Sequence, residues 1–214
     1  MQLYKSYNNT QEVFLIFGGF ASHFSHFEPF FRDYILLYNY THLDFNTLVN
    51  SLNALPKDCK ITLIAFSMGV FVARIFLSTH AFKPHKAIAI NGTEYGIQNN
   101  YGIPLTLFKR THQQFLKHKD LAITQFKSNL FGEHLDKARN FSFLDSNFLC
   151  DELAFFMESC AKHSTLLEPI TWDFALISTR DLIFNPQAQR AFWGGRTNIV
   201  ELNAPHFAFF SWKF

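Results

Sequence analysis

Short apolar runs recur along the chain, and helical patterns separate several of them. Six runs are rich in β-branched and aromatic residues and predict strands at residues 13–17, 35–38, 61–65, 87–90, 174–178 and 198–202. Most are apolar throughout, which is typical of parallel strands buried on both faces of a sheet. Leucine and other apolar residues at helical spacing predict helices over residues 45–55 and 68–80. The pattern therefore predicts an α/β fold with a mostly parallel sheet of about six strands.

One long segment interrupts this alternation. Between about residues 96 and 168 the strand pattern vanishes and several short helices are expected, before strands resume at Phe174. An insertion at this point lies near the carboxyl ends of the strands, where open α/β sheets bind ligands. We therefore expect a single domain over residues 1–214, with a core of 1–95 and 169–214 and a helical cap insertion of 96–168.

Composition narrows the class of protein. The 214 residues are 48% hydrophobic and carry a formal net charge of +2, which excludes a disordered chain and gives no sign of nucleic-acid binding. The first apolar run is far shorter than the ~20 residues that span a bilayer, and the amino terminus lacks the pattern of a signal peptide. Three cysteines form no disulfide framework. These features indicate a cytoplasmic protein, with no membrane or nucleic-acid partner.

A metal site is not expected. His23 and His26 are three residues apart, and Cys160 and His163 share that spacing, but neither pair has a further ligand or an HExxH pattern. Histidines that are exposed or satisfied in the core explain both pairs.

A serine stands between a predicted strand and a predicted helix. The sequence Ala65-Phe66-Ser67-Met68-Gly69 follows an apolar run and precedes a helical pattern, as in the nucleophile elbow of α/β-hydrolases. Small residues two positions before and after the serine relieve crowding in that turn, and Ala65 replaces the usual glycine. The Met68 N–H is the expected donor to an oxyanion. The alternative is that Ser67 only caps the helix.

An acid and a base follow in the order that this fold uses. Asp181 comes shortly after the predicted strand 174–178, and His206 follows the last strand, 198–202. We expect Ser67, Asp181 and His206 to form a catalytic triad. Glu94, which comes after the predicted strand ending at Ile90, is the reserve candidate for the acid, whereas Asp173 precedes its strand and is disfavoured. A solvated loop or helix cap is the ordinary alternative for Asp181.

The loop after the first apolar run is a candidate for the rest of the oxyanion hole. Phe17-Gly18-Gly19-Phe20-Ala21 lets the backbone approach a substrate closely, and the Phe20 N–H is the expected second donor. A phosphate-binding loop is disfavoured because neither a third glycine nor Lys-Ser/Thr follows. A plain turn remains the alternative.

Five motifs together resemble one known family. They are Phe17-Gly18-Gly19-Phe20-Ala21, Ala65-Phe66-Ser67-Met68-Gly69, Ala89-Ile90-Asn91-Gly92-Thr93, Tyr101-Gly102-Ile103-Pro104 and Ala204-Pro205-His206-Phe207. In this combination the chain resembles BioG-type pimeloyl-[acyl-carrier protein] methyl ester esterases, which are small α/β-hydrolases, over nearly its whole length. The resemblance implies a serine carboxylesterase that needs no cofactor and uses Ser67, Asp181 and His206. Its substrate would be the methyl ester of pimeloyl-acyl-carrier protein, cleaved to pimeloyl-acyl-carrier protein and methanol in biotin precursor synthesis.

The predicted cap carries a basic stretch. Lys109, Arg110, Lys117 and Lys119 are opposed by one acid, Asp120. Carrier proteins are acidic, so these residues are candidates for docking a carrier-bound substrate, whereas a solvated helical face is the ordinary alternative. The oligomeric state is not encoded in such patterns.

Phenylalanine is unusually frequent, with 28 residues beside 7 Tyr and 3 Trp. We expect three roles: core packing, the surroundings of the catalytic residues and an apolar acyl channel. The candidates are, respectively, Phe14, Phe17 and Phe76; Phe20, Phe66 and Phe207; and Phe108, Phe115 and Phe126.

Two other functions fit the same residues. A different acyl esterase or a thioesterase would use the same triad with another acyl pocket. A non-catalytic binding protein of the same fold is disfavoured, because all three triad residue types occupy their expected places.

Overall fold

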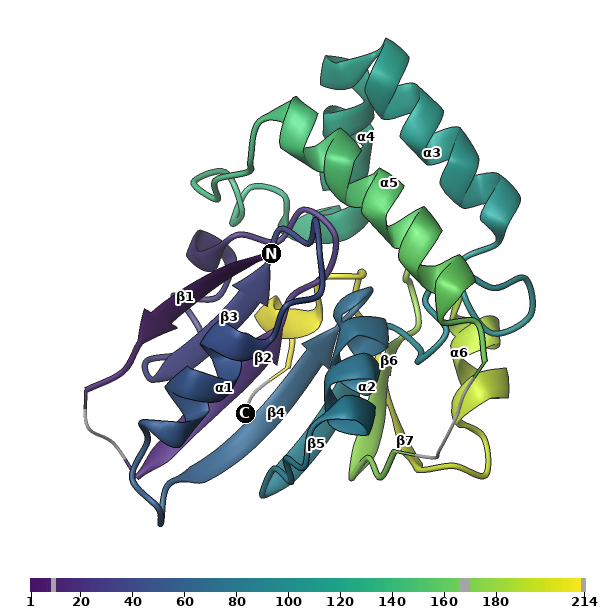
Figure 1. The fold of residues 1–214 in the computed structure, drawn as a ribbon. Coiled ribbons are helices and arrows are strands. Elements are labelled where there is room, and N and C mark those ends of the chain that lie inside the picture. The colour runs from purple at the N-terminus through teal and green to yellow at the C-terminus, as the bar shows by residue number, and fades with distance from the viewer. Residues whose placement is uncertain (9–10, 166–169, 213–214) are drawn as a thin grey trace.

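The chain forms a seven-stranded sheet in the order β1-β3-β2-β4-β5-β6-β7 (Figure 1), in a computed structural model that describes residues 1–8, 11–165 and 170–212. All neighbouring pairs are parallel except β1 and β3, which are antiparallel. The strands are β1 (Gln2–Ser6), β2 (Glu12–Phe17), β3 (Tyr34–Tyr38), β4 (Lys60–Phe66), β5 (Lys86–Ile90), β6 (Phe174–Ser178) and β7 (Asn198–Leu202).

The six predicted strands are confirmed as β2 to β7, and the class is α/β with a mostly parallel sheet. The strand that the pattern missed is β1, which lies at the edge and pairs only with β3. Its residues are half-buried or exposed, so no continuous apolar run marks it. By contrast, all five residues of β3 are buried.

Helices α1 (Asn46–Asn53) and α2 (Gly69–Thr79) follow β3 and β4, as predicted. A further helix, α6 (Pro186–Trp193), had not been expected; Asn185 caps its amino end and Pro186 begins it. The predicted cap contains α3 (Leu105–Lys117), α4 (Lys119–Phe131) and α5 (Ser146–Lys162). These three helices have 13, 13 and 17 residues, so they are longer than the short helices expected from the sequence.

The sheet is covered differently on its two faces. Val13, Leu15 and Leu63 pack into a core with α1, α2 and α6. The alternate residues, such as Ile16 and Ile64, pack into a second core. There the covering comes from the short turns η1 (Phe24–His26) and η3 (Ala208–Phe210) and from the end of α4.

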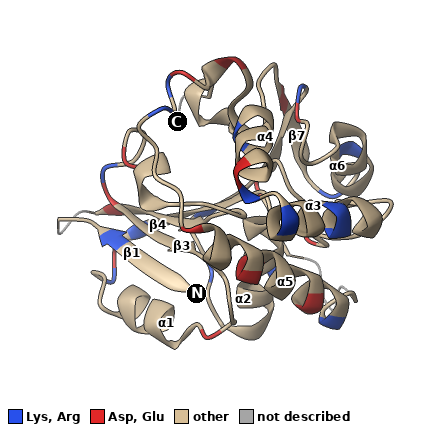
Figure 2. Cartoon of the chain, turned by 90° about the horizontal axis from the view of Figure 1, so that it is seen from above, with Lys and Arg blue, Asp and Glu red and all other residues tan. Residues whose placement is uncertain are grey.

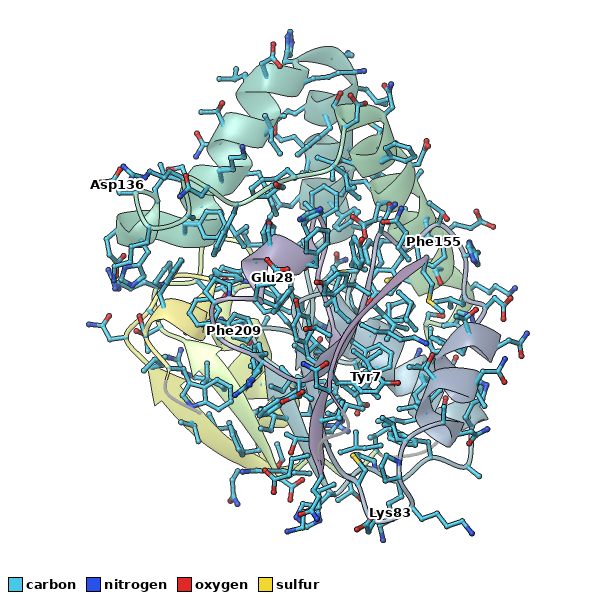
Figure 3. All side chains as sticks on the ribbon, turned by 90° about the vertical axis from the view of Figure 1, so that its left-hand side faces the viewer. Tyr7, Glu28, Lys83, Asp136, Phe155 and Phe209 are labelled. Atoms are coloured by element: carbon cyan, nitrogen blue, oxygen red, sulfur yellow. The ribbon has the colours of Figure 1, made fainter. Side chains whose placement is uncertain are left out.

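Aromatic rings fill this second face. Phe27, Phe31, Phe207 and Phe209 pack in a chain of ring contacts with centroids 4.9 to 6.4 Å apart. Each ring contributes a large apolar area, so a few phenylalanines cover the sheet where short turns replace longer helices. Figure 3 shows Phe209 among the crowded side chains beside the sheet. Much of the phenylalanine content is therefore used on this face.

The cap helices lie over the carboxyl ends of the parallel strands (Figure 1). In the chain they stand between β5 and β6. The end of the cap proposed at residue 168 lies outside the described residues. Among the residues described, no helix is both long and apolar enough to cross a bilayer.

Candidate active site

Ser67 occupies a tight turn between β4 and α2. Its φ of 56° lies in the left-handed region, which is costly for a residue with a Cβ and is found where surrounding structure enforces it. The Ser67 N–H donates to the carbonyl of Ile90 at the end of β5, with a length of 2.8 Å. This bond anchors the turn to the neighbouring strand and presents Ser67 at the sheet edge.

Three glycines allow neighbouring chain segments to approach this turn. A Cβ at Gly19 would lie 2.7 Å from the Ser67 Cβ, and a Cβ at Gly92 would lie 2.2 Å from the Ser67 carbonyl oxygen. A Cβ at Gly69 would lie 2.1 Å from the carbonyl oxygen of Phe17. Real side chains do not tolerate such contacts, so the turn can be this compact only with glycine at these positions.

The helix after the turn does not use the serine as its cap. Helix α2 begins at Gly69, its N-cap is Met68, and no side-chain hydrogen bond caps it. The alternative in which Ser67 serves only as a helix cap is therefore wrong. The amino end of α2 instead lies beside Ser67, where its dipole favours negative charge.

His206 and Asp181 form a buried pair. The Nδ1 atom of His206 lies 2.7 Å from Oδ2 of Asp181, and both side chains are almost fully buried. We assign the Nδ1 proton from this contact, since a carboxylate accepts a hydrogen bond and leaves Nε2 of a neutral imidazole as an acceptor. The Phe66 ring packs against the imidazole, with centroids 5.0 Å apart.

The Asp181 carboxylate is held by four groups. Its Oδ1 atom accepts the backbone N–H groups of Ile183 and Phe184, each at 2.8 Å. Its Oδ2 atom accepts from Gln189 at 3.3 Å in addition to His206. These bonds fix the orientation of the carboxylate towards His206.

The other acids considered lie elsewhere. Oε1 of Glu94 accepts the indole N–H of Trp172 at 2.7 Å, and burial raises the pKa of this glutamate. Oδ2 of Asp173 accepts the Ala87 N–H at 2.7 Å, at the beginning of β5. Neither contact involves His206, so Asp181 is the acid that the structure brings to the histidine.

Asn91 holds the histidine loop, a role that the sequence analysis did not assign. Its Nδ2 group donates to the backbone carbonyl of His206 and to Oγ of Ser178, and its Oδ1 accepts the Ser178 N–H at 2.7 Å. Asn91 follows β5 with a φ of 50°. An asparagine followed by glycine after a strand is a signal for this left-handed conformation, and it could have marked the position.

The expected oxyanion donors flank Ser67. Phe20 and Met68 both line the cavity that contains Ser67 and His206. Within the part of the chain that the structure describes, neither residue uses its N–H in a backbone hydrogen bond. Two unused donors beside a serine suit an oxygen that becomes negative during a reaction.

The cavity has a volume of about 140 Å³ and is bounded by the cap. Phe108, Phe115 and Phe126 line it, as the sequence predicts, and Phe20 meets the last two rings edge-on. Phe207, expected beside the base, follows His206 directly and packs in the aromatic cluster on the second face of the sheet rather than lining the cavity. None of the described residues that line the cavity is Asp, Glu, Lys or Arg.

His26 is a buried histidine that does not line the cavity. It lies against Phe131, Phe141, Phe143 and Phe207, and its Nε2 lies 2.7 Å from the carbonyl oxygen of Ser142. Burial lowers the pKa of His26 to about 3, so the ring is neutral at ordinary pH. This histidine therefore joins the turn η1 to the cap as a packing group.

The four basic candidates on the cap are all exposed. Figure 2 shows basic segments along α3, whereas the neighbouring α5 carries acidic ones. Arg110 and Lys117 are seven residues apart, with Gln114 between them, so the three share one side of α3. Gln114 lines the cavity, which puts Arg110 and Lys117 near it. Lys119 donates to Oδ1 of Asn147 at 2.6 Å.

A comparison with family models decides the class of this chain. Residues 4–214 match the model described as "Pimeloyl-ACP methyl esterase BioG". The chain belongs to the BioG family. It is a carboxylic ester hydrolase with an α/β-hydrolase fold, and the family connects it with biotin synthesis.

Solved structures agree with this family and fold. The crystal structure of BioG from Haemophilus influenzae is 25% identical, has a TM-score of 0.84, and is matched over 98% of this chain and 95% of that chain. An esterase from Exiguobacterium antarcticum is 14% identical with a TM-score of 0.66, covering 97% of this chain and 88% of that one. The latter likeness shows the shared fold.

One curated relative combines this region with additional sequence. A malonyl-[acyl-carrier protein] O-methyltransferase from Bacteroides fragilis is 27% identical over 197 residues, which are 89% of this chain. The match spans only 38% of that protein, so the larger part of it has no counterpart here. An uncharacterized protein from Haemophilus influenzae is 29% identical, covering 83% of this chain and 78% of its own length.

Proposed function

We propose that this member of the BioG family hydrolyses the methyl ester of pimeloyl-acyl-carrier protein and releases methanol, as a cytoplasmic step of biotin precursor synthesis. The observation that carries the proposal is the Asp181–His206 pair at a cavity shared with Ser67. Ser67 would be the nucleophile, His206 the general base and Asp181 the group that orients it.

The first half of the reaction forms an acyl-enzyme. Oγ of Ser67 attacks the ester carbonyl carbon while Nε2 of His206 takes the hydroxyl proton. The carbonyl oxygen becomes negative and accepts the N–H groups of Phe20 and Met68. The bond to the methoxy oxygen then breaks, and His206 gives its proton to the departing methanol.

The second half restores the serine. Water attacks the acyl carbon and gives a proton to His206, and the bond between that carbon and Oγ of Ser67 breaks. The proton returns to the serine, and the pimeloyl chain leaves with a free carboxylate. Throughout, Asp181 accepts the Nδ1–H of His206 and stabilises the imidazolium.

The cavity supports a neutral, apolar acyl group near Ser67. Its described lining carries no formal charge at Asp, Glu, Lys or Arg, and three cap phenylalanines contribute apolar surface. A methyl ester is uncharged, whereas a free carboxylate would lose its hydration without gaining a cation there. The ester is therefore favoured as the bound form, and its acid product is favoured to leave.

A carrier-bound substrate is supported by two further observations. The relative from Bacteroides fragilis is named for methylating malonyl-[acyl-carrier protein], and an enzyme of that activity produces a methyl ester on a carrier. The exposed Arg110 and Lys117 lie on the side of α3 that includes the cavity residue Gln114. We propose that the basic cap residues dock an acidic carrier protein, with these two nearest the cavity.

Turnover of three substrates tests the reaction. Carrier-bound methyl pimelate, free monomethyl pimelate and a pimeloyl thioester are compared with the protein and with Ser67→Ala. We expect cleavage of the carrier-bound methyl ester, and a loss of at least about 10³-fold in Ser67→Ala. Ser128→Ala, an exposed serine of α4, is the matched control and should retain full activity. Unchanged activity of Ser67→Ala would contradict the catalytic proposal, and preferred cleavage of the thioester would favour a thioesterase.

Charge reversal tests the carrier. In Arg110→Glu/Lys117→Glu we expect KM for the carrier-bound ester to rise about tenfold while KM for the free ester stays constant. Lys83→Glu is the control, because Lys83 is exposed at the end of the molecule opposite the cap (Figure 3). Equal effects on the carrier-bound and free esters would argue against docking by this face.

A further inference from the structure

A glutamate of the cap is fully buried against the core. Glu152 lies in α5 and has no exposed surface. Its Oε2 accepts the Ala21 N–H and its Oε1 accepts the Tyr40 N–H, both at 2.9 Å. Both oxygens of one carboxylate therefore hold backbone groups of two loops that follow neighbouring strands, β2 and β3.

The position of Glu152 in its helix accounts for its burial. Leu149, Leu153 and Phe156 form the apolar face of α5, and helical spacing puts Glu152 on that face. A carboxylate among leucine and phenylalanine is costly unless its oxygens are hydrogen-bonded. Here the partners are backbone N–H groups rather than a basic side chain. The carboxylate therefore fixes the position of the two loops that carry these groups.

Ala21 is adjacent to the expected oxyanion donor. It follows Phe20 directly, and its φ of 60° lies in the left-handed region. The peptide group between Phe20 and Ala21 includes the N–H that Glu152 accepts, so this bond restrains the orientation of the Phe20 backbone. A small rotation there moves the Phe20 N–H away from a developing oxyanion, which lowers the rate more than the binding of substrate.

We propose that Glu152 is a positioning residue that holds the oxyanion turn in its active conformation through the Ala21 N–H. The inference rests on the proposed function, in which the Phe20 N–H stabilises the oxyanion. Because Glu152 belongs to α5, the cap would then contribute to the reaction as well as enclose the acyl group: it supplies the carboxylate that accepts the Ala21 N–H.

The charge state of Glu152 supports a pH-dependent effect. Burial raises the pKa of Glu152 to about 7, against the opposing effect of its two backbone hydrogen bonds and the Met1 amino group. Tyr40 faces it but stays neutral, since burial raises the phenol pKa well above its ordinary value. Asp44 and His42 lie around the Met1 amino group. Protonation puts an O–H donor where one backbone N–H needs an acceptor, and this loosens the turn.

Glu152→Gln tests the assignment. Its amide oxygen can accept from one N–H, but its amide nitrogen then faces the other donor. We expect kcat for the methyl ester to fall at least about tenfold, with KM within about twofold. Below pH 7, log(kcat/KM) of the wild type should fall more steeply with decreasing pH than that of the variant, because protonation of Glu152, whose pKa is about 7, adds a loss that Glu152→Gln lacks. Asp151→Asn, an exposed acid on the same helix, should match the wild type.

Amide exchange gives a readout independent of turnover. The amide protons of Ala21 and Tyr40 should exchange at least about tenfold faster in Glu152→Gln than in the wild type or Asp151→Asn. Unchanged exchange, or an unchanged kcat and pH slope in a folded variant, would overturn the role of Glu152. A wild type that cleaves no ester contradicts the proposed function instead, and the exchange rates still decide whether Glu152 holds the turn.

Discussion

The backbone carbonyl of Leu130 accepts a hydrogen bond of 2.8 Å from the N–H of Phe207. Leu130 is in the last turn of α4, and Phe207 follows His206 directly. Next to this bond, Gly132 lies against Pro205, which precedes His206. The cap therefore holds the histidine loop from one side while Asn91 holds the His206 carbonyl from the core.

Gly132→Ala should disturb this contact. Gly132 has a φ of 51°, and a Cβ there would lie 3.0 Å from the Pro205 Cβ. We expect a loss of about 1–3 kcal/mol in unfolding free energy from the strained backbone. We also expect a lower kcat, because the added methyl group displaces the loop that carries His206. Denaturant unfolding and ester hydrolysis measure the two effects.

Gly195→Ala separates strain from contact. Gly195 has a φ of 74°, and a Cβ there meets nothing within 4 Å. The variant should lose a similar amount of stability and keep its kcat. An equal fall of kcat in both variants would show that the contact with Pro205 has no part in the activity.

Asp181→Asn tests which acid orients the histidine. The backbone N–H groups of Ile183 and Phe184 favour the amide oxygen at the Oδ1 position, so the amide nitrogen faces His206 and favours the wrong tautomer. We expect kcat to fall by about 10⁴-fold. Glu94→Gln should change kcat only a few-fold, since Glu94 bonds to Trp172 instead. The opposite ranking of the two variants would assign the role to Glu94.

Acid should destabilise the fold through His26. Its folded-state pKa of about 3 lies below its ordinary 6.5, so the unfolded chain binds a proton first as pH falls. Stability is lost progressively from about pH 6.5 towards 3, and the loss at pH 5 is roughly 2 kcal/mol. His26→Gln should lack this component, whereas His85→Gln, an exposed control, should retain it. Equal pH dependence in wild type and His26→Gln, measured by denaturant unfolding, would contradict this expectation.

Ionisation of Glu152 should give the free energy of unfolding the opposite pH dependence. Its folded-state pKa of about 7 lies above its ordinary 4.5, so the folded chain keeps a proton that the unfolded chain has lost. Stability therefore falls as pH rises from about 4.5 through 7, by on the order of 3 kcal/mol, and stays constant above. Denaturant unfolding of the wild type and Glu152→Gln at pH 5 and pH 8 checks this expectation. If the difference in unfolding free energy between the two proteins is the same at both pH values, the expectation is wrong.

The strands around the site could be predicted because burial on both faces leaves an unmistakable apolar run. All of β3 and the second half of β4 are buried in this way, and Ser67 is the first residue after β4. β1 could not be found in this way, because an edge strand with half-exposed residues lacks such a run. The length of the cap helices was also missed, since α4 has apolar residues around its whole circumference.

The candidate site also contains residues that the sequence indicates and residues that it does not. Ser67, Asp181 and His206 could be proposed from the sequence because each follows the carboxyl end of a strand, in the chain order that α/β-hydrolases use. The groups that hold the loops around the site depend on contacts between distant segments, such as Asn91 with His206, 115 positions apart, and Glu152 with Ala21, 131 positions apart. Glu152 did leave a trace in its place on the apolar face of α5, but nothing local specifies its partners.

Among the residues described, four non-glycine residues have left-handed backbone, and each follows one of four neighbouring strands: Asn39 after β3, Ala21 after β2, Ser67 after β4 and Asn91 after β5. Such conformations exclude β-branched side chains and proline almost entirely. A complete substitution scan that selects only for folding should therefore show a line of intolerant positions across this edge. The edge of the sheet that carries the candidate site would be visible in such a map before any substrate was added.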